Sequence, residues 1–128
     1  MPKGERQYIH FIEDIVNAVK KVERYTKSLD YEDFIDDEMA VDAVIRNFEV
    51  IGEAVNNIPD EVRKKYPDVE WSEAVGFRNV MIHNYFGLDL EAVWDTITKN
   101  IPDLKKHIKK VLDSERKKRK GKKFHQSP

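Results

Sequence analysis

The chain of 128 residues has the length of one domain, with 40% hydrophobic and 37% charged side chains. It contains no cysteine, which excludes disulfide scaffolds, zinc-thiolate sites, iron-sulfur clusters and thiol nucleophiles. No apolar run is long enough to span a membrane, and the charged N-terminal segment is not followed by the apolar region of a signal peptide. We therefore expect a soluble, cytoplasmic protein.

The net charge of −1 conceals an uneven distribution. Residues 1–104 hold 12 basic and 22 acidic side chains, a net charge of −10, whereas residues 105–128 hold 11 basic and two acidic ones, a net charge of +9. The basic end can attract phosphate groups, or it can be a solvated helix end where cations suit the helix dipole. We predict one helical bundle over residues 1–114, followed by a basic tail, residues 115–128, that is disordered or a frayed helix.

The first half of the chain predicts two long helices joined by a short one. Apolar residues at spacings of three and four indicate an amphipathic helix over residues 6–25. An acidic start predicts a short helical turn over residues 30–34. The same periodicity predicts a long helix over residues 37–57, which Pro59 ends.

The second half predicts further helices with polar residues at their starts. Asp60 is the expected N-cap of a short helix, and Ser72 is the expected N-cap of a helix that continues to about residue 83 or 85. Asp89 is the expected N-cap of a last long helix over residues 90–112, which Pro102 should kink. The predicted fold class is an all-α, antiparallel bundle of four to five helices.

Most of the usual catalytic patterns are missing from the sequence. The four histidines are scattered, with no pair at the spacing of a helical metal site, and every glycine is isolated, which excludes a phosphate-binding loop. We expect neither a metal nor another cofactor. Trp71 and Trp94 are expected to anchor the core or a dimer interface rather than to stack on bases.

One segment, residues 76–86, combines side chains that can perform proton transfer and bind anions: Arg78, Asn79, His83 and Tyr85. On a helix Asn79 and His83 share a face, so the amide can orient the imidazole. Arg78 lies about 140° around the same helix from His83. Convergence of the two therefore requires a bent Arg78 side chain, local unwinding, or a second copy of the helix across a symmetric dimer.

An arginine and a histidine without a metal fit the cleavage of RNA by its own 2′-hydroxyl. A histidine near neutrality can move the proton of the attacking or the leaving oxygen, and an arginine can stabilise the charge on the phosphoryl oxygens. By this chemistry alone, structural hydrogen bonds are the commoner role for such a pair on one helix.

Arg78, Asn79, His83 and Tyr85 form the pattern R-N-x-x-x-H-x-Y within a wider frame of residues 43–54, Tyr66-Pro67, Trp71, Phe86-Gly87 and Val93-Trp94. This frame covers about residues 6–112 and resembles the HepT-like family of HEPN ribonuclease toxins. The resemblance implies a bundle that dimerises, so that the facing motifs of two protomers form one ribonuclease cleft. It implies that Arg78 and His83 are the catalytic pair and that Asn79 supports them.

The resemblance also implies partners for the protein. It predicts an RNA substrate and the role of toxin in a type VII toxin-antitoxin system. The cognate antitoxin is a minimal nucleotidyltransferase, which would inactivate the toxin by AMPylation of Tyr85. An alternative from a different class stays open, in which the chain is a non-catalytic helical partner subunit of the nucleotidyltransferase.

Overall fold

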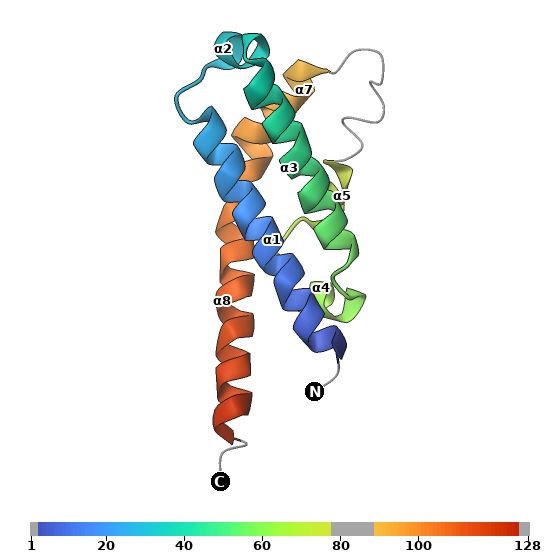
Figure 1. The fold of residues 1–128 in the computed structure, drawn as a ribbon. Coiled ribbons are helices and arrows are strands. Elements are labelled where there is room, and N and C mark those ends of the chain that lie inside the picture. The colour runs from blue at the N-terminus through green and yellow to red at the C-terminus, as the bar shows by residue number, and fades with distance from the viewer. Residues whose placement is uncertain (1–2, 78–88, 126–128) are drawn as a thin grey trace.

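The computed structural model describes residues 3–77 and 89–125, with side chains described for residues 8–77 and 89–118 (Figure 1). Every secondary-structure element in these ranges is helical, which confirms the predicted all-α class. The helices, with η1 a π-helix, are α1 (Lys3–Thr26), α2 (Tyr31–Asp36), α3 (Glu38–Asn56), α4 (Asp60–Lys65), α5 (Trp71–Gly76), α7 (Leu90–Asp95), η1 (Thr96–Asn100) and α8 (Ile101–His125).

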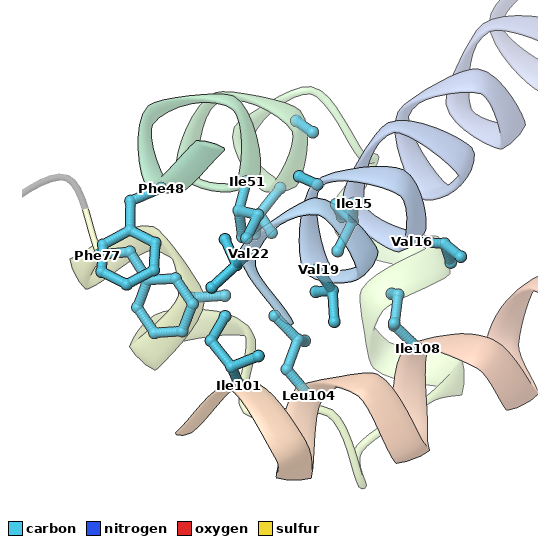
Figure 2. Packing of buried hydrophobic residues seen from close by; sticks show 14 of the residues in the cluster. Ile15, Val16, Val19, Val22, Phe48, Ile51, Phe77, Ile101, Leu104 and Ile108 are labelled. Atoms are coloured by element: carbon cyan, nitrogen blue, oxygen red, sulfur yellow. The ribbon is translucent and has the colours of Figure 1, made fainter. Parts of the chain in front are cut away.

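Helix α1 is the central element of the bundle. It contacts both α3 and α8 and runs antiparallel to each of them (Figure 1). Most of the apolar stripe predicted for this helix is buried: Ile12, Ile15, Val19 and Val22 are at most 1% exposed, whereas Tyr25 at its end is 37% exposed. Figure 2 shows Ile15, Val19 and Val22 meeting residues of α3 and α8, together with Phe77 just after α5. For α1 the periodicity of the sequence thus predicted the helix and most of the face that it buries.

Three aspartates cap helices through their side chains. Asp30 forms a capping box with Asp33 at the start of α2, and Asp37 accepts a hydrogen bond from the Ala40 N–H at 3.0 Å. Asp89 accepts one from the Ala92 N–H at 3.1 Å, which confirms its predicted role as an N-cap. Each carboxylate satisfies an N–H group that has no partner within its helix.

Two predicted caps are wrong. Asp60 is the first residue of α4, whose N-cap is Pro59, and its carboxylate instead pairs with Arg63 and Lys64 on the same helix. Ser72 is the second residue of α5, which starts at Trp71 without a side-chain cap. The indole N–H of Trp71 donates to carbonyl oxygens eight and five residues earlier, and these hydrogen bonds fix the start of the helix.

The last predicted helix is interrupted just before Pro102. The interruption is the π turn η1, in which the Ile101 N–H donates to the Thr96 carbonyl five residues earlier. Pro102 has no N–H, so the Thr98 carbonyl cannot receive an α-helical hydrogen bond from it. The expected kink therefore takes the form of a wider helical turn.

Helix α8 continues to His125, through most of the segment predicted as a basic tail. Glu115 lies one residue beyond the predicted boundary but is only 2% exposed, so contacts with the bundle extend past Ser114. In the described ranges, no helix is both long enough and apolar enough to cross a membrane.

Candidate functional site

All four motif residues lie outside the described residues. Arg78, Asn79, His83 and Tyr85 fall within residues 78–88, so their roles and their mutual geometry stay predictions. The same holds for the continuation of the predicted helix beyond Gly76. The structure instead describes the elements that lead into and out of this segment.

Before the motif, the chain is anchored by aromatic side chains. The indole N–H of Trp71 donates to the carbonyl oxygens of Arg63 and Tyr66, each at 3.0 Å, which joins the start of α5 to the end of α4. At the other end of α5, Phe77 is 3% exposed and its ring centroid lies 5.2 Å from that of Phe48 on α3 (Figure 2). The residue directly before Arg78 is therefore fixed in the core.

After the motif, the chain is fixed again at the start of α7. Asp89 caps this helix, and Val93 is fully buried one turn later. Trp94 packs on Phe34 with ring centroids 5.3 Å apart and on Tyr31 with centroids 6.2 Å apart, as predicted for a core anchor. A side-chain hydrogen bond from Asn100 to Glu73 at 2.5 Å connects η1 with α5. Rigid elements thus position both ends of the segment that carries the motif.

A second polar cluster lies where the start of α1, the end of α4 and the middle of α8 meet. The Glu115 carboxylate accepts hydrogen bonds from the hydroxyls of Tyr8 and Tyr66. Lys118 lies 3.5 Å from the same carboxylate, with its ammonium 5.6 Å from the centre of the Tyr66 ring. The Ser114 hydroxyl lies 3.2 Å from the Tyr66 hydroxyl and donates to its oxygen, because the single proton of Tyr66 points to Glu115. This cluster joins three distant parts of the sequence.

The surroundings of this cluster shift three pKa values. Burial acts to raise the pKa of Glu115, but the hydrogen bonds from Tyr66 and Tyr8 and the charge of Lys118 outweigh it, and the pKa lies below its ordinary value. Burial and the hydrogen bond to Glu115 raise the pKa of Tyr66. Burial acts to lower the pKa of Lys118, but the charge of Glu115 raises it overall. Glu115 is therefore an ionised carboxylate that Tyr8, Tyr66 and Lys118 hold in place.

The sequence did not predict this cluster, because Glu115 was assigned to the basic tail of residues 115–128. The signal was present in the spacing, since Leu104, Ile108, Val111 and Glu115 follow one another at intervals of four, three and four residues. The first three are buried in the core, and Glu115 continues their stripe. Among the described residues no group of His, Asp and Glu is arranged to hold a metal ion.

Comparison with known proteins identifies the class. The family described as "Ribonuclease HepT-like" matches residues 15–111, a range that contains the whole motif. The chain belongs to the HepT-like ribonuclease family, as the resemblance predicted.

Individual relatives match over nearly their whole length. The chain is 43% identical over 112 residues to "Putative RNase MJ0125" of Methanocaldococcus jannaschii, which covers 88% of this chain and 95% of the relative. It is 39% identical over 115 residues to "Putative RNase TTE0752" of Caldanaerobacter subterraneus subsp. tengcongensis, covering 89% and 99%. It is 37% identical over 107 residues to "Probable ribonuclease HepT" of Thermococcus cleftensis, covering 84% and 97%. No solved structure matches the chain significantly.

Proposed function

We propose that the protein is a metal-independent endoribonuclease and the toxin of a type VII toxin-antitoxin system. The observation that carries this proposal is the family match over residues 15–111, which includes R-N-x-x-x-H-x-Y at residues 78–85. Relatives that carry the name of ribonucleases and align over more than nine tenths of their length support it.

The proposed reaction uses the 2′-hydroxyl of the RNA as the nucleophile. As the 2′-oxygen attacks the adjacent phosphorus, His83 accepts its proton or delivers one to the leaving 5′-oxygen. Arg78 stabilises the negative charge on the phosphoryl oxygens, and Asn79 orients the imidazole. The products are a 2′,3′-cyclic phosphate and a 5′-hydroxyl, and DNA is not cleaved. We further propose that the motifs of two protomers face each other in a dimer, because one helix alone does not aim Arg78 and His83 at the same point.

The test is cleavage of RNA by the purified protein in EDTA, with analysis of the new ends. We expect the wild type to release 2′,3′-cyclic phosphate ends, and His83→Ala and Arg78→Ala to lower the rate by about 10²-fold or more. His10→Ala is the matched control, because His10 is exposed on α1, outside the motif, with its Nδ1 atom 3.3 Å from the Glu13 carboxylate. Intact RNA, or cleavage that His83→Ala leaves unchanged, would overturn the enzyme proposal. A stable complex with the nucleotidyltransferase would then favour the non-catalytic partner subunit.

We propose that Tyr85 is the site of control. An AMP group on its hydroxyl would add a bulky phosphodiester anion two residues from His83, where it would compete for Arg78 and repel RNA phosphates. With ATP and the cognate nucleotidyltransferase, the wild type should gain the mass of one or more AMP units and lose ribonuclease activity. Tyr85→Phe should gain no mass and keep its activity. An adduct on another residue, found by peptide mass spectrometry, would remove Tyr85 from this scheme.

A further inference from the structure

A cavity of about 530 Å³ opens beside the end of α1, away from the Glu115 cluster. Its walls come from the last turn of α1 and the residues after it, from α7 and η1, and from the first turns of α8. The volume falls within the range of about 300–1,000 Å³ that small-molecule sites occupy. The cavity is therefore large enough for a ligand the size of a nucleotide.

The charges that line the cavity favour an anion. Arg24, Lys27 and Lys105 contribute three cations, and Glu23 contributes one carboxylate, which Lys105 approaches at 3.0 Å. Lys27 has no ion-pair partner among the described residues, and the Arg24 guanidinium lies 5.2 Å from the centre of the Tyr25 ring. Two of these cations belong to residues 1–104, which carry a net charge of −10. A local excess of positive charge in so acidic a region indicates a site for phosphate.

The apolar wall of the cavity includes an indole. Trp94 is half-buried against Phe34 and Tyr31 and also lines the cavity, with Leu29 and Ile97 nearby. Its indole N–H has no hydrogen-bond acceptor within the described part of the chain. An aromatic ring fixed by packing and placed beside cations is the combination with which proteins stack a nucleobase and hold its phosphate.

The π turn forms another part of this wall. Ile97 and Thr98 of η1 line the cavity, and the Thr98 hydroxyl donates to the Trp94 carbonyl at 3.1 Å. Single π turns inside α-helices occur frequently at functional sites. The π turn thus lies in the wall of the cavity, and a hydrogen bond connects it to the backbone of Trp94.

We propose that this cavity binds a nucleoside phosphate, with the base against Trp94, a role that the sequence did not predict for this residue, and the phosphate near Lys27 and Lys105. The ligand is either a free nucleotide or one nucleotide of an RNA strand, and the second source rests on the proposed ribonuclease function. Neither the family match nor the motif assigns a role to this cavity.

The two tryptophans allow a direct test by NMR on the full chain labelled with ¹⁵N. Each indole N–H gives one signal, and that of Trp71 is hydrogen-bonded to two carbonyls away from the cavity. We expect 5′-AMP or a 2′-O-methyl RNA oligonucleotide, which cannot be cleaved through its 2′-oxygen, to shift the Trp94 signal and leave the Trp71 signal in place. Inorganic phosphate serves as the probe without a base and should not reproduce the shift.

Paired variants assign the site. Lys27→Ala with Lys105→Ala should weaken binding by about tenfold or more, since charged hydrogen bonds are lost. Lys20→Ala with Lys109→Ala is the matched control, because both lysines are exposed, lie on α1 and α8 and do not line the cavity. If AMP shifts the Trp94 signal, the ligand is a free nucleotide. If only the oligonucleotide shifts it, the ligand is one nucleotide of an RNA strand. Either result supports the site.

Three outcomes would overturn the proposal: no shift of Trp94 by either ligand, equal weakening by the two lysine pairs, or an equal shift by inorganic phosphate. Because the readout is binding rather than cleavage, it is independent of the catalytic motif. A protein that cleaves no RNA but shows the Trp94 response would contradict the proposed function alone.

Discussion

Glu115 shows how a single buried carboxylate can connect parts of the chain that lie more than 100 residues apart. Its partner Tyr8 is near the start of α1, and its partner Tyr66 is just after α4. Its two carboxylate oxygens each accept a hydrogen bond from a different tyrosine, so an amide in its place leaves one hydroxyl donor facing an NH2 group and Lys118 without its counter-charge. The lower end of the bundle in Figure 1, where α1 begins and α4 lies, should depend on this residue.

We expect Glu115→Gln to lower the free energy of unfolding by about 1–3 kcal/mol at pH 7, measured by urea denaturation. Asp113→Asn is the control, since Asp113 is an exposed acid two residues away on the same helix. The control should change the stability by less than about 0.5 kcal/mol.

The same comparison has a predicted pH dependence. The pKa of Glu115 is lowered in the folded protein, so its contribution is complete above the pKa of the unfolded chain and is lost as the pH falls through the folded value. The difference in stability between the wild type and Glu115→Gln should therefore be largest near neutrality and shrink below about pH 4. A difference that is the same at pH 7 and pH 3 would contradict this account.

At the scale of single elements, α7 has a stability that depends on its cap. This helix is only six residues long and begins directly after the segment that carries the motif. Asp89→Ala should destabilise the protein by about 1 kcal/mol, because the Ala92 N–H loses its acceptor. Asp89→Asn keeps an oxygen acceptor, so it should lower the stability by only roughly a few tenths of a kcal/mol. Equal losses in the two variants would show that the charge at this position matters rather than the cap.

The elements also show what a sequence can predict. The long helices and the cap at Asp89 follow from local rules of periodicity and hydrogen bonding, whereas Asp30 and Asp37, expected as the first residues of helices, are in fact their caps. The start of α5 does not, because it depends on hydrogen bonds from the Trp71 indole to the end of α4. The Glu115 cluster and the cavity beside Trp94 each need three segments to meet in space. The motif was visible in the sequence, but its roles stay predictions, because residues 78–88 lie outside the described part of the chain.

At the scale of the whole molecule, the charge is divided between an acidic bundle and a basic end. If the basic end contacts RNA phosphates, removal of residues 119–128 takes away four cations and should flatten the salt dependence of RNA binding by up to about 3 in log–log slope. The truncation begins after Lys118 so that the Glu115 cluster stays intact. A filter-binding series in 50 to 200 mM salt on a 2′-O-methyl RNA measures the slope. An unchanged slope would leave this end as a solvated helix.

The proposed composite cleft predicts complementation between subunits. Arg78→Ala and His83→Ala should each be inactive alone, but mixed dimers of the two would retain one copy of each side chain. After co-unfolding and refolding of the mixture, we expect partial recovery of ribonuclease activity. A mixture as inactive as either variant would argue for a cleft built within one protomer.

The π turn η1 also determines which face of α8 points into the core. Val93 and Ile101 are both fully buried, yet eight residues of regular α-helix would place them about 80° apart around the axis. The wider turn removes most of this angle and lets one buried stripe continue from α7 to Glu115. Loss of one residue within η1 could therefore be absorbed by a return to regular helix, whereas the same deletion in the following turns would rotate Glu115 away from its two tyrosines. Length variation within this family should be tolerated at η1 and excluded between Leu104 and Glu115.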